Sequence, residues 1–322
     1  MVRYFVCLRR NILAQSTKKK RTSKTSLVFA IILALLGFSA VLYPLVSTLH
    51  NNAAASRVAD QARNEVQQLD EGYKDQLIEQ MRQYNESLMS HPIDPGVPDS
   101  QEMYPTDEYK KYLDVGRPSL ESTDIISEVI IPDVSIKLPV YRGSGPSSLN
   151  RGAGHLFGTT LPVGGAGSNT TITAHTGMAT ATMFDNLINL KPGQDIYIST
   201  MGEMMRYRMV DSKVVPPETT DAIPMAGKSD LDRLFLITCT PYGLNFHRLV
   251  VEAHRIPLDA DPAPDDVEDV VNEVGPWQWW MTLTVVVVVG VVLLFGFILW
   301  RVLRGRKSRT VSYSSGSRFV QG

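Results

Sequence analysis

The stretch LFLITCTPYGLNFHRLVV, residues 234–251, decides the fold of this chain. Its apolar first half predicts a buried strand that ends at Cys239, and a turn-rich loop leads to Arg248 at the head of a second apolar strand. Because neighbouring antiparallel strands bring such ends together, we expect the thiol and the guanidinium to meet. Upstream, His175 also stands at a predicted strand end, in TITAHTG (171–177). Cys, His and Arg placed in this way suggest a thiol transpeptidase.

Several motifs, in this order, resemble those of the sortases. The family reads TLxTC at its nucleophile, and this chain reads FLITC at 235–239, departing only at the first position. TPYG followed by HR, the TAHTG box and GHLFGTTLPVGG (154–165) are similar to the pilus-assembling class C sortases. The resemblance covers roughly residues 125–254. It implies a mainly β fold: a closed eight-stranded sortase barrel with N-terminal helices and flanking transmembrane helices.

Residues 125–257 are expected to form this catalytic barrel. Many short strands with one helix indicate a closed barrel, and about 130 residues suffice for one buried core. The pattern predicts strands at 126–131, 136–141, 170–174, 196–199, 205–215, 234–239 and 249–253, with a short helix over 183–190.

Two apolar runs, 26–46 and 277–300, are long enough to cross a bilayer as helices. Basic clusters lie before the first run and after the second, so we expect both tails, 1–25 and 301–322, to be cytoplasmic and the part between the runs to lie outside. A cleaved signal peptide is the alternative for the first run. It is less favoured, because the run is long and no small-x-small site clearly ends it.

The charge and the cysteine content reduce the number of function classes that fit this chain. The formal net charge of −1 gives no basic surface for nucleic acid. The two cysteines are Cys7, in the expected cytoplasmic tail, and Cys239, outside, so the membrane separates them and excludes an intrachain disulfide. A lone exported thiol is a small buried hydrophobe or a reactive group, and the surrounding motif favours the reactive group.

Residues 47–124 are expected to be a helical segment with a Pro-rich loop. An apolar stripe at helical spacing runs through 53–90, with Gly72 as a candidate break, and we favour helices packed on the domain over a coiled-coil dimer. The loop 91–105 holds four prolines. In class C sortases such a loop is a lid with an Asp-Pro-aromatic motif. Asp94 and Pro95 match its start, Gly96 stands where the aromatic residue would be, and lid and plain linker both stay open.

The acidic segment 258–276 reads as an extended tether. The Gly-rich GGAGSN at 164–169 lacks the helix and the Gly-Lys-Ser/Thr of a phosphate loop. Six histidines show no CxxC or HExxH spacing, so zinc is disfavoured and no cofactor is expected.

A thiol with a pKa of about 8.5 needs a cationic neighbour to ionise at neutral pH. The resemblance assigns the roles: Cys239 as nucleophile, His175 as proton donor to the leaving amine, and Arg248 holding the substrate or the oxyanion. Thr238, His155 and His247 are candidates for supporting or binding substrate. The alternative for each histidine is a hydrogen-bonded structural or rim position, and for Thr238 it is an ordinary β-branched residue of a strand. No Asp or Glu in these motifs is expected to orient the histidine.

The sequence therefore predicts a membrane-anchored cysteine transpeptidase of a Gram-positive cell. By resemblance, it would cleave LPxTG-like sorting signals of pilins or surface proteins and join the acyl group to a pilin lysine. Two alternatives remain: a housekeeping sortase that uses the cell-wall precursor as acceptor, and a catalytically silent scaffold with a sortase-like barrel.

Overall fold

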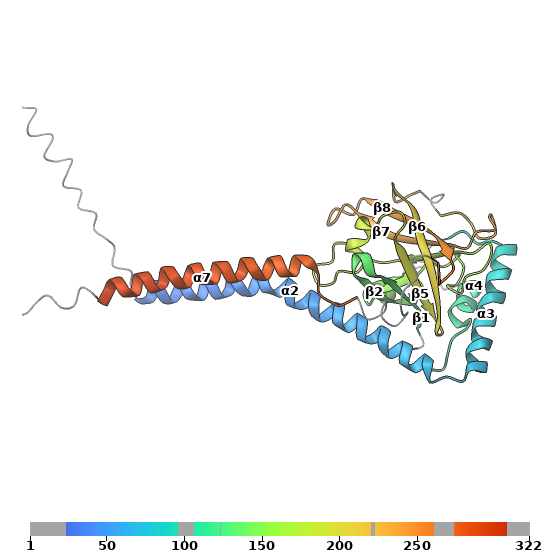
Figure 1. Ribbon diagram of the computed structural model, residues 1–322, viewed down its shortest axis with the longest axis horizontal. Helices are drawn as coiled ribbons and strands as arrows, with labels where there is room; N and C mark the ends of the chain where they lie inside the picture. Colours follow the sequence, from blue (N-terminus) through green and yellow to red (C-terminus); the bar gives the residue numbers. More distant parts are fainter. Residues whose placement is uncertain (1–23, 96–105, 123, 220–222, 261–273, 308–322) are drawn as a thin grey trace, which may run out of the picture. The chain divides into compact units, whose positions relative to one another are not determined.

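The computed structural model describes residues 24–95, 106–122, 124–219, 223–260 and 274–307. The chain divides into two compact units, Met1–Tyr43 and Pro44–Gly322. The described part of the first unit is a stretch of the long helix α2 (Lys24–Gln67), whereas the second unit contains the barrel (Figure 1). No helix boundary follows residue 46, because α2 continues through Pro44 as one element.

The helix α3 (Glu71–Ser90) packs against the barrel. Asp70 caps it by accepting a hydrogen bond from the Tyr73 N–H at 3.2 Å, so the break after α2 falls at 68–70. We expected the break between the two helices at Gly72, but this residue lies in the first turn of α3. The predicted apolar stripe is buried in the main core, and its members on α3 include Leu77, Met81, Tyr84 and Leu88. These side chains of the stripe are thus buried within this chain, as expected for helices packed on the domain.

The helix α4 (Asp107–Asp114) was not predicted. Thr106 caps it, with its hydroxyl 3.2 Å from the Tyr109 N–H. At eight residues, with one fully buried side chain (Tyr112), the helix carries too little apolar periodicity to be recognised.

Eight strands close into one barrel in the order β1-β2-β3-β4-β7-β8-β6-β5 (Figure 1). All neighbours are antiparallel except two parallel pairs, β2 with β3 and β4 with β7. The predicted closed barrel is confirmed, and only β3 was missed, since three residues give no readable pattern. The strands are β1 (Ile125–Ile131), β2 (Ile136–Arg142), β3 (Ala153–His155), β4 (Asn169–Thr173), β5 (Asp195–Thr200), β6 (Glu203–Val215), β7 (Arg233–Thr240) and β8 (His247–Ile256).

Among the described residues, three short helical segments join the strands: η1 (Pro132–Val134), α5 (Pro146–Leu149) and η2 (Asp185–Asn189). The helix expected over 183–190 is this last element, a 3-10 helix of five residues. Alternate positions of each strand face the barrel interior, so that Leu234 and Leu236 on β7 pack beside Val251 and Ala253 on β8, all fully buried. Each such side chain contributes roughly 1.5–3 kcal/mol of transfer free energy.

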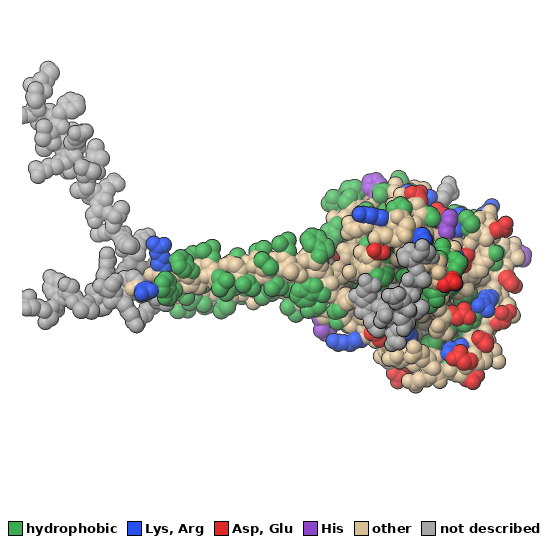
Figure 2. Space-filling view, viewed as in Figure 1, with side chains coloured by type: hydrophobic (Ala, Val, Ile, Leu, Met, Phe, Trp, Pro, Cys, Tyr) green, Lys and Arg blue, Asp and Glu red, His purple; other side chains and the backbone are tan. Residues whose placement is uncertain are grey.

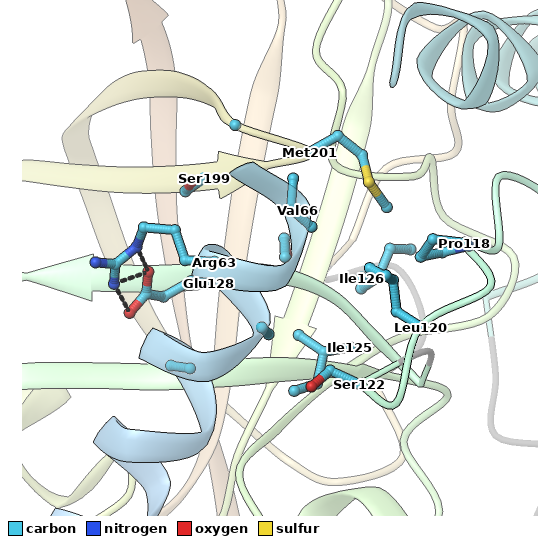
Figure 3. Close-up of a pocket in the computed structure, with 14 residues that line it drawn as sticks. Arg63, Val66, Pro118, Leu120, Ser122, Ile125, Ile126, Glu128, Ser199 and Met201 are labelled. Atoms are coloured by element: carbon cyan, nitrogen blue, oxygen red, sulfur yellow. Dashed lines mark hydrogen bonds and ion pairs between the residues drawn. The ribbon is translucent and has the colours of Figure 1, made fainter. Parts of the chain in front are cut away.

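An ion-pair network joins α2 to the barrel wall. The Arg63 guanidinium donates to both carboxylate oxygens of Glu128 on β1, at 2.9 and 2.7 Å (Figure 3). Lys137 on β2 donates to Asp60 at 2.9 Å. Burial raises the pKa of Glu128 and the Arg63 charge opposes that rise. A small cavity of about 40 Å³ lies next to this pair, between α2 and β1. The part of α2 beyond the apolar run is therefore held to the catalytic barrel.

The acidic segment 258–276 is attached to the barrel at both of its described ends. The buried Arg206 donates to the carbonyl oxygens of Leu258 and Ala260, at 3.1 and 2.6 Å. Val274 packs with Ile130 and Tyr197. The expected extended tether is thus wrong for these ends, and residues 261–273 lie outside the described residues.

In the described part of the chain, two helices are long and apolar enough to cross a membrane. In α7 (Trp279–Lys307) the candidate span is Trp279–Arg301, with a mean hydropathy of 2.9, and in α2 it lies within Ile31–Gln67, with 2.1. Figure 2 shows hydrophobic side chains along the surfaces of these helices. By length and composition, both helices could cross a bilayer, which is consistent with the two predicted spans.

Candidate active site

The pairing of β7 with β8 sets Cys239 directly opposite Arg248. Both side chains are partly buried, at the end of the barrel where the two strands meet their connecting loop. The Arg248 guanidinium also donates to two carbonyls of its own loop, Asn245 at 3.3 Å and His247 at 3.2 Å. These bonds hold a permanent positive charge beside the thiol.

His175 reaches the same end of the barrel through the parallel pairing of β4 with β7. The last register pair is Thr173 with Ile237, and the Ala174 N–H donates to the Ile237 carbonyl at 3.2 Å. His175 and Cys239 each stand two residues beyond this last pair. His175 therefore lies just past the end of β4, at the level of Cys239 near the end of β7. The His175 carbonyl then accepts from the Phe184 N–H at 3.0 Å, which closes the 176–183 loop.

Thr238 links β7, the strand that contains Cys239, to the loop 176–183 that follows His175, which we call the histidine loop. Its buried hydroxyl donates to the Ala174 carbonyl at 2.8 Å and is hydrogen-bonded to the Thr176 hydroxyl. The two partners flank His175 in sequence. The side chain of Thr238 is therefore directed into the protein, where it fixes the backbone on both sides of the histidine.

The β7–β8 loop packs closely on the turn that follows His175. Gly177 has a φ of +81°, and a Cβ there would lie 2.9 Å from the Gly243 nitrogen. Asn245 adds a hydrogen bond from its side-chain amide to the Thr176 carbonyl, at 3.3 Å. Glycine is needed at 177 both for its left-handed backbone and for this close approach.

Asp185, at the start of η2, belongs to the same region and was missed by the sequence analysis. Its carboxylate accepts the Gly177 N–H at 2.8 Å. Burial raises the pKa of Asp185 to about 6, against the lowering effect of that hydrogen bond. Burial also raises the pKa of Tyr242 in the β7–β8 loop, with the Asp185 charge adding to the effect. In MFDNL (183–187) nothing distinguishes this carboxylate from a solvated helix cap, so the sequence offered no signal for this contact.

His155 is a core residue. It is fully buried, its Nε2 lies 2.8 Å from the Thr160 carbonyl oxygen, and its Nδ1 lies 3.0 Å from the Tyr112 hydroxyl. Since a carbonyl oxygen only accepts, Nε2 carries the proton and Nδ1 accepts from the tyrosine. Burial lowers the pKa of His155 to about 4. The ring is neutral and sealed from substrate, so it supports the fold, which was the alternative for this residue.

His247 lies at the rim. It is opposite Thr240 in the β7–β8 ladder, partly exposed, with its ring edge-on to Phe246 at 5.2 Å between centroids. Among the described residues, no three His, Cys, Asp or Glu side chains form a group that could hold a metal ion.

The start of the 91–105 loop lies against the segment between β3 and β4. A Cβ on Gly158 would lie 2.9 Å from both the Asp94 carbonyl oxygen and the Pro95 Cα, and Ile93 packs on the main core. The Asp94 side chain is exposed. Residues 96–105, including Gly96 and Tyr104, lie outside the described residues.

A closed mixed β-barrel with cysteine and arginine opposed on neighbouring strands, and histidine after the adjoining parallel strand, is the arrangement of the sortase class. The Sortase domain model matches residues 129–256. A lid mutant of sortase A from Corynebacterium diphtheriae is 39% identical, with 60% of this chain and 99% of that one covered, at a TM-score of 0.52. The chain belongs to the sortase family.

Class C sortases are among its structural relatives, and the chain is most like that class. A mutant of sortase C-1 from S. pneumoniae is 35% identical over 62% of this chain and 96% of that one, with a TM-score of 0.52. Sortase A from Streptococcus agalactiae is 30% identical over 36% of this chain, and sortase A from Bacillus anthracis 29% over 43%. The match covers 47% and 63% of the length of these two curated relatives.

Proposed function

We propose that this chain is a membrane-anchored cysteine transpeptidase that cleaves LPxTG-like sorting signals and transfers the acyl group to an amine. The observation that carries the proposal is the strand register that opposes Cys239 to Arg248 and brings His175 to the same end of the barrel. Nucleophile, proton donor and cation are the three groups that acyl transfer requires.

In the first half-reaction the Cys239 thiolate attacks the threonine carbonyl of the sorting signal, forming a carbon–sulfur bond and an oxyanion. Arg248 stabilises that negative charge. As the tetrahedral intermediate collapses, protonated His175 donates its proton to the leaving glycine nitrogen and the carbon–nitrogen bond breaks. The acyl group remains on Cys239 as a thioester. In the second half, an uncharged amine attacks the thioester and gives a proton to the now neutral His175, the carbon–sulfur bond breaks as the amide forms, and the Cys239 thiolate and protonated His175 are restored.

The acceptor we propose is a lysine of a pilin. The likeness to class C sortases supports this choice. The start of the 91–105 loop agrees with it, because Asp94 and Pro95, the pair with which a class C lid would begin, pack at Gly158. A lysine with a pKa of about 10.4 is almost wholly protonated at neutral pH, so a cover that excludes water from the thioester would help to deprotonate it.

A second acceptor is the amine of a cell-wall precursor, which the likeness to curated sortases A favours. A competition assay separates the two acceptors. With the loop intact, a Lys-bearing pilin domain should outcompete a glycine peptide for the thioester. Deleting 96–104 should abolish that preference and speed alkylation of Cys239, and an unchanged preference and rate would favour the precursor.

The transpeptidase proposal is tested with the full chain in detergent micelles. After incubation with an LPxTG peptide, mass spectrometry should find the acyl adduct on the peptide that contains Cys239. Cys7 is a control thiol in the same molecule, because it lies outside the proposed site, and a free peptide thiol gives the reference rate of alkylation. Absence of the adduct, with Cys239 no more reactive than Cys7, would leave the silent scaffold.

For the topology we propose that both tails are cytoplasmic and the barrel lies outside, since each basic cluster flanks a candidate span. A reporter that is active only in the cytoplasm should work when fused after Gly322. A fusion that is active only outside the cell would reverse this topology.

A further inference from the structure

Three large apolar side chains of the β7–β8 loop are exposed beside the active site. Tyr242, Leu244 and Phe246 have exposed fractions of 64%, 65% and 54%. Figure 2 shows hydrophobic side chains on the barrel surface around the joined ends of β7 and β8. Single exposed apolar residues are common, but three within five positions of one loop mark a surface that contacts something apolar. We call these three residues the apolar tip.

The apolar tip is attached to the segment 176–186. Gly243 lies against Gly177, and the Asn245 amide donates to the Thr176 carbonyl at 3.3 Å. The tip and this segment therefore form one continuous surface at the catalytic end of the barrel.

The same segment is hydrogen-bonded to residues that lie next to both candidate spans. On α2, the Asn52 amide donates to the Thr182 hydroxyl at 2.8 Å and its oxygen accepts the Thr182 N–H at 3.1 Å, while Asn51 donates to the Thr180 carbonyl at 2.9 Å. On the other side, Asn186 donates to the Gln278 side-chain oxygen at 2.7 Å.

Gln278 lies at the start of the apolar run 277–300 and directly before α7, whose candidate span is Trp279–Arg301. The partner of Asn186 is therefore the residue next to this candidate span. Segment 176–186 must then lie at the membrane surface wherever α7 is inserted. Ile188 on η2 and Trp277 beside Gln278, exposed at 55% and 48%, extend the apolar surface in the same place.

We propose that the catalytic end of the barrel rests on the lipid bilayer that holds α7, with the apolar tip in the interfacial layer. Aromatic and aliphatic side chains on a short loop are the kind that lipid interfaces accept. Cys239, at the base of that loop, is then held near the headgroups. The enzyme would meet its substrates as polypeptides presented from the membrane plane. The inference rests on the proposed membrane anchoring and adds an orientation of the barrel.

Photolabelling tests this orientation with the full chain in phosphatidylcholine–phosphatidylglycerol nanodiscs. The discs contain a phospholipid with a diazirine close to its headgroup, and a second sample receives a water-soluble diazirine. Labelled peptides are quantified by mass spectrometry. We expect lipid labelling of the 242–246 peptide at least fivefold above that of the peptide around Leu231. Leu231 is the matched control, because it is 49% exposed and lies before β7, at the strand end away from Cys239.

Substituting Leu244→Ser and Phe246→Ser together should reduce lipid labelling of the neighbouring Ile188 and Trp277 peptides, whereas Leu231→Ser should leave it unchanged. The proposal is overturned if the apolar tip is labelled by the water-soluble probe alone, or if the sorting-signal peptide protects it in detergent, which would assign it to substrate. Labelled spans with an unlabelled tip would refute the orientation and leave the anchoring. Failure of Cys239 to acylate would refute the transpeptidase function and leave the lipid contact unaffected.

Discussion

Asp185 should make the stability of the barrel depend on pH in a direction opposite to that of an ordinary paired carboxylate. Its pKa is raised by burial to about 6, so the folded state holds the proton more tightly than the unfolded chain does. The stabilising contribution is complete below the ordinary pKa of 3.8 and is lost as the pH rises through about 6. At pH 7.5 the folded protein carries an ionised, partly buried carboxylate whose described hydrogen bond comes from Gly177.

The size of the effect follows from the two pKa values. A pKa of about 6 against 3.8 corresponds to about 3 kcal/mol of unfolding free energy at neutral pH. Asp185 keeps some contact with solvent, and screening reduces this to about 1–2 kcal/mol. Asp185→Asn keeps an acceptor for the Gly177 N–H and removes the charge. The variant should therefore be more stable than the parent at pH 7.5, with a melting temperature higher by about 3–6 °C, and equal to it at pH 4.

The assay is thermal unfolding of the full chain in detergent micelles, at one scan rate, from pH 4 to pH 8. Asp114→Asn is the matched control, because the Asp114 side chain is 80% exposed and lies in α4, away from the histidine loop. The quantity of interest is the difference between variant and parent as a function of pH. A difference that is constant across this range, or one that is largest at pH 4, would refute the argument.

Further predictions concern the groups around the thiol. His175→Ala and Arg248→Ala should each lower the transpeptidation rate by roughly a hundredfold or more, and near-parental activity in either variant would remove that residue from the mechanism. Thr238→Val should cost about 1–3 kcal/mol in urea unfolding and lower kcat more than it raises KM, with Thr238→Ser restoring both. Gly177→Ala should destabilise by more than Gly243→Ala, since both glycines have positive φ and only a Cβ on Gly177 is crowded; equal losses would contradict this.

The barrel and the positions of the three candidate catalytic groups could be predicted from the sequence, because the pattern that indicates them is local. Cys239, Arg248 and His175 all stand where an apolar strand meets a turn, so strand pairing alone brings them to one end of the barrel. Elements too short to carry a clear apolar pattern could not be predicted from the sequence. Strand β3 has three residues, and α4 has one fully buried side chain, which nevertheless orients His155.

Contacts between distant segments were beyond prediction for a different reason. The register of β4 on β7 places Thr238 opposite the residues that flank His175, but nothing in FLITC indicates that its threonine hydroxyl turns toward that loop. Asp185 carries no pattern of its own, since a carboxylate at the start of a short helix is usually a solvated cap. Its environment exists only because the 176–184 loop folds back over it.

These contacts explain how a histidine beyond the end of its strand can be held in place. Residues after β4 have left the ladder, so their position depends on bonds from elsewhere. Thr238 supplies them from β7, Asp185 from η2 through Gly177, and Asn52 from α2 through Thr182. One of the three supports is on α2, the helix that contains the first candidate span. The histidine loop should accordingly exchange its amide hydrogens faster in Asn52→Ala than in the parent, and an unchanged rate for residues 176–182 would show that the barrel alone positions His175.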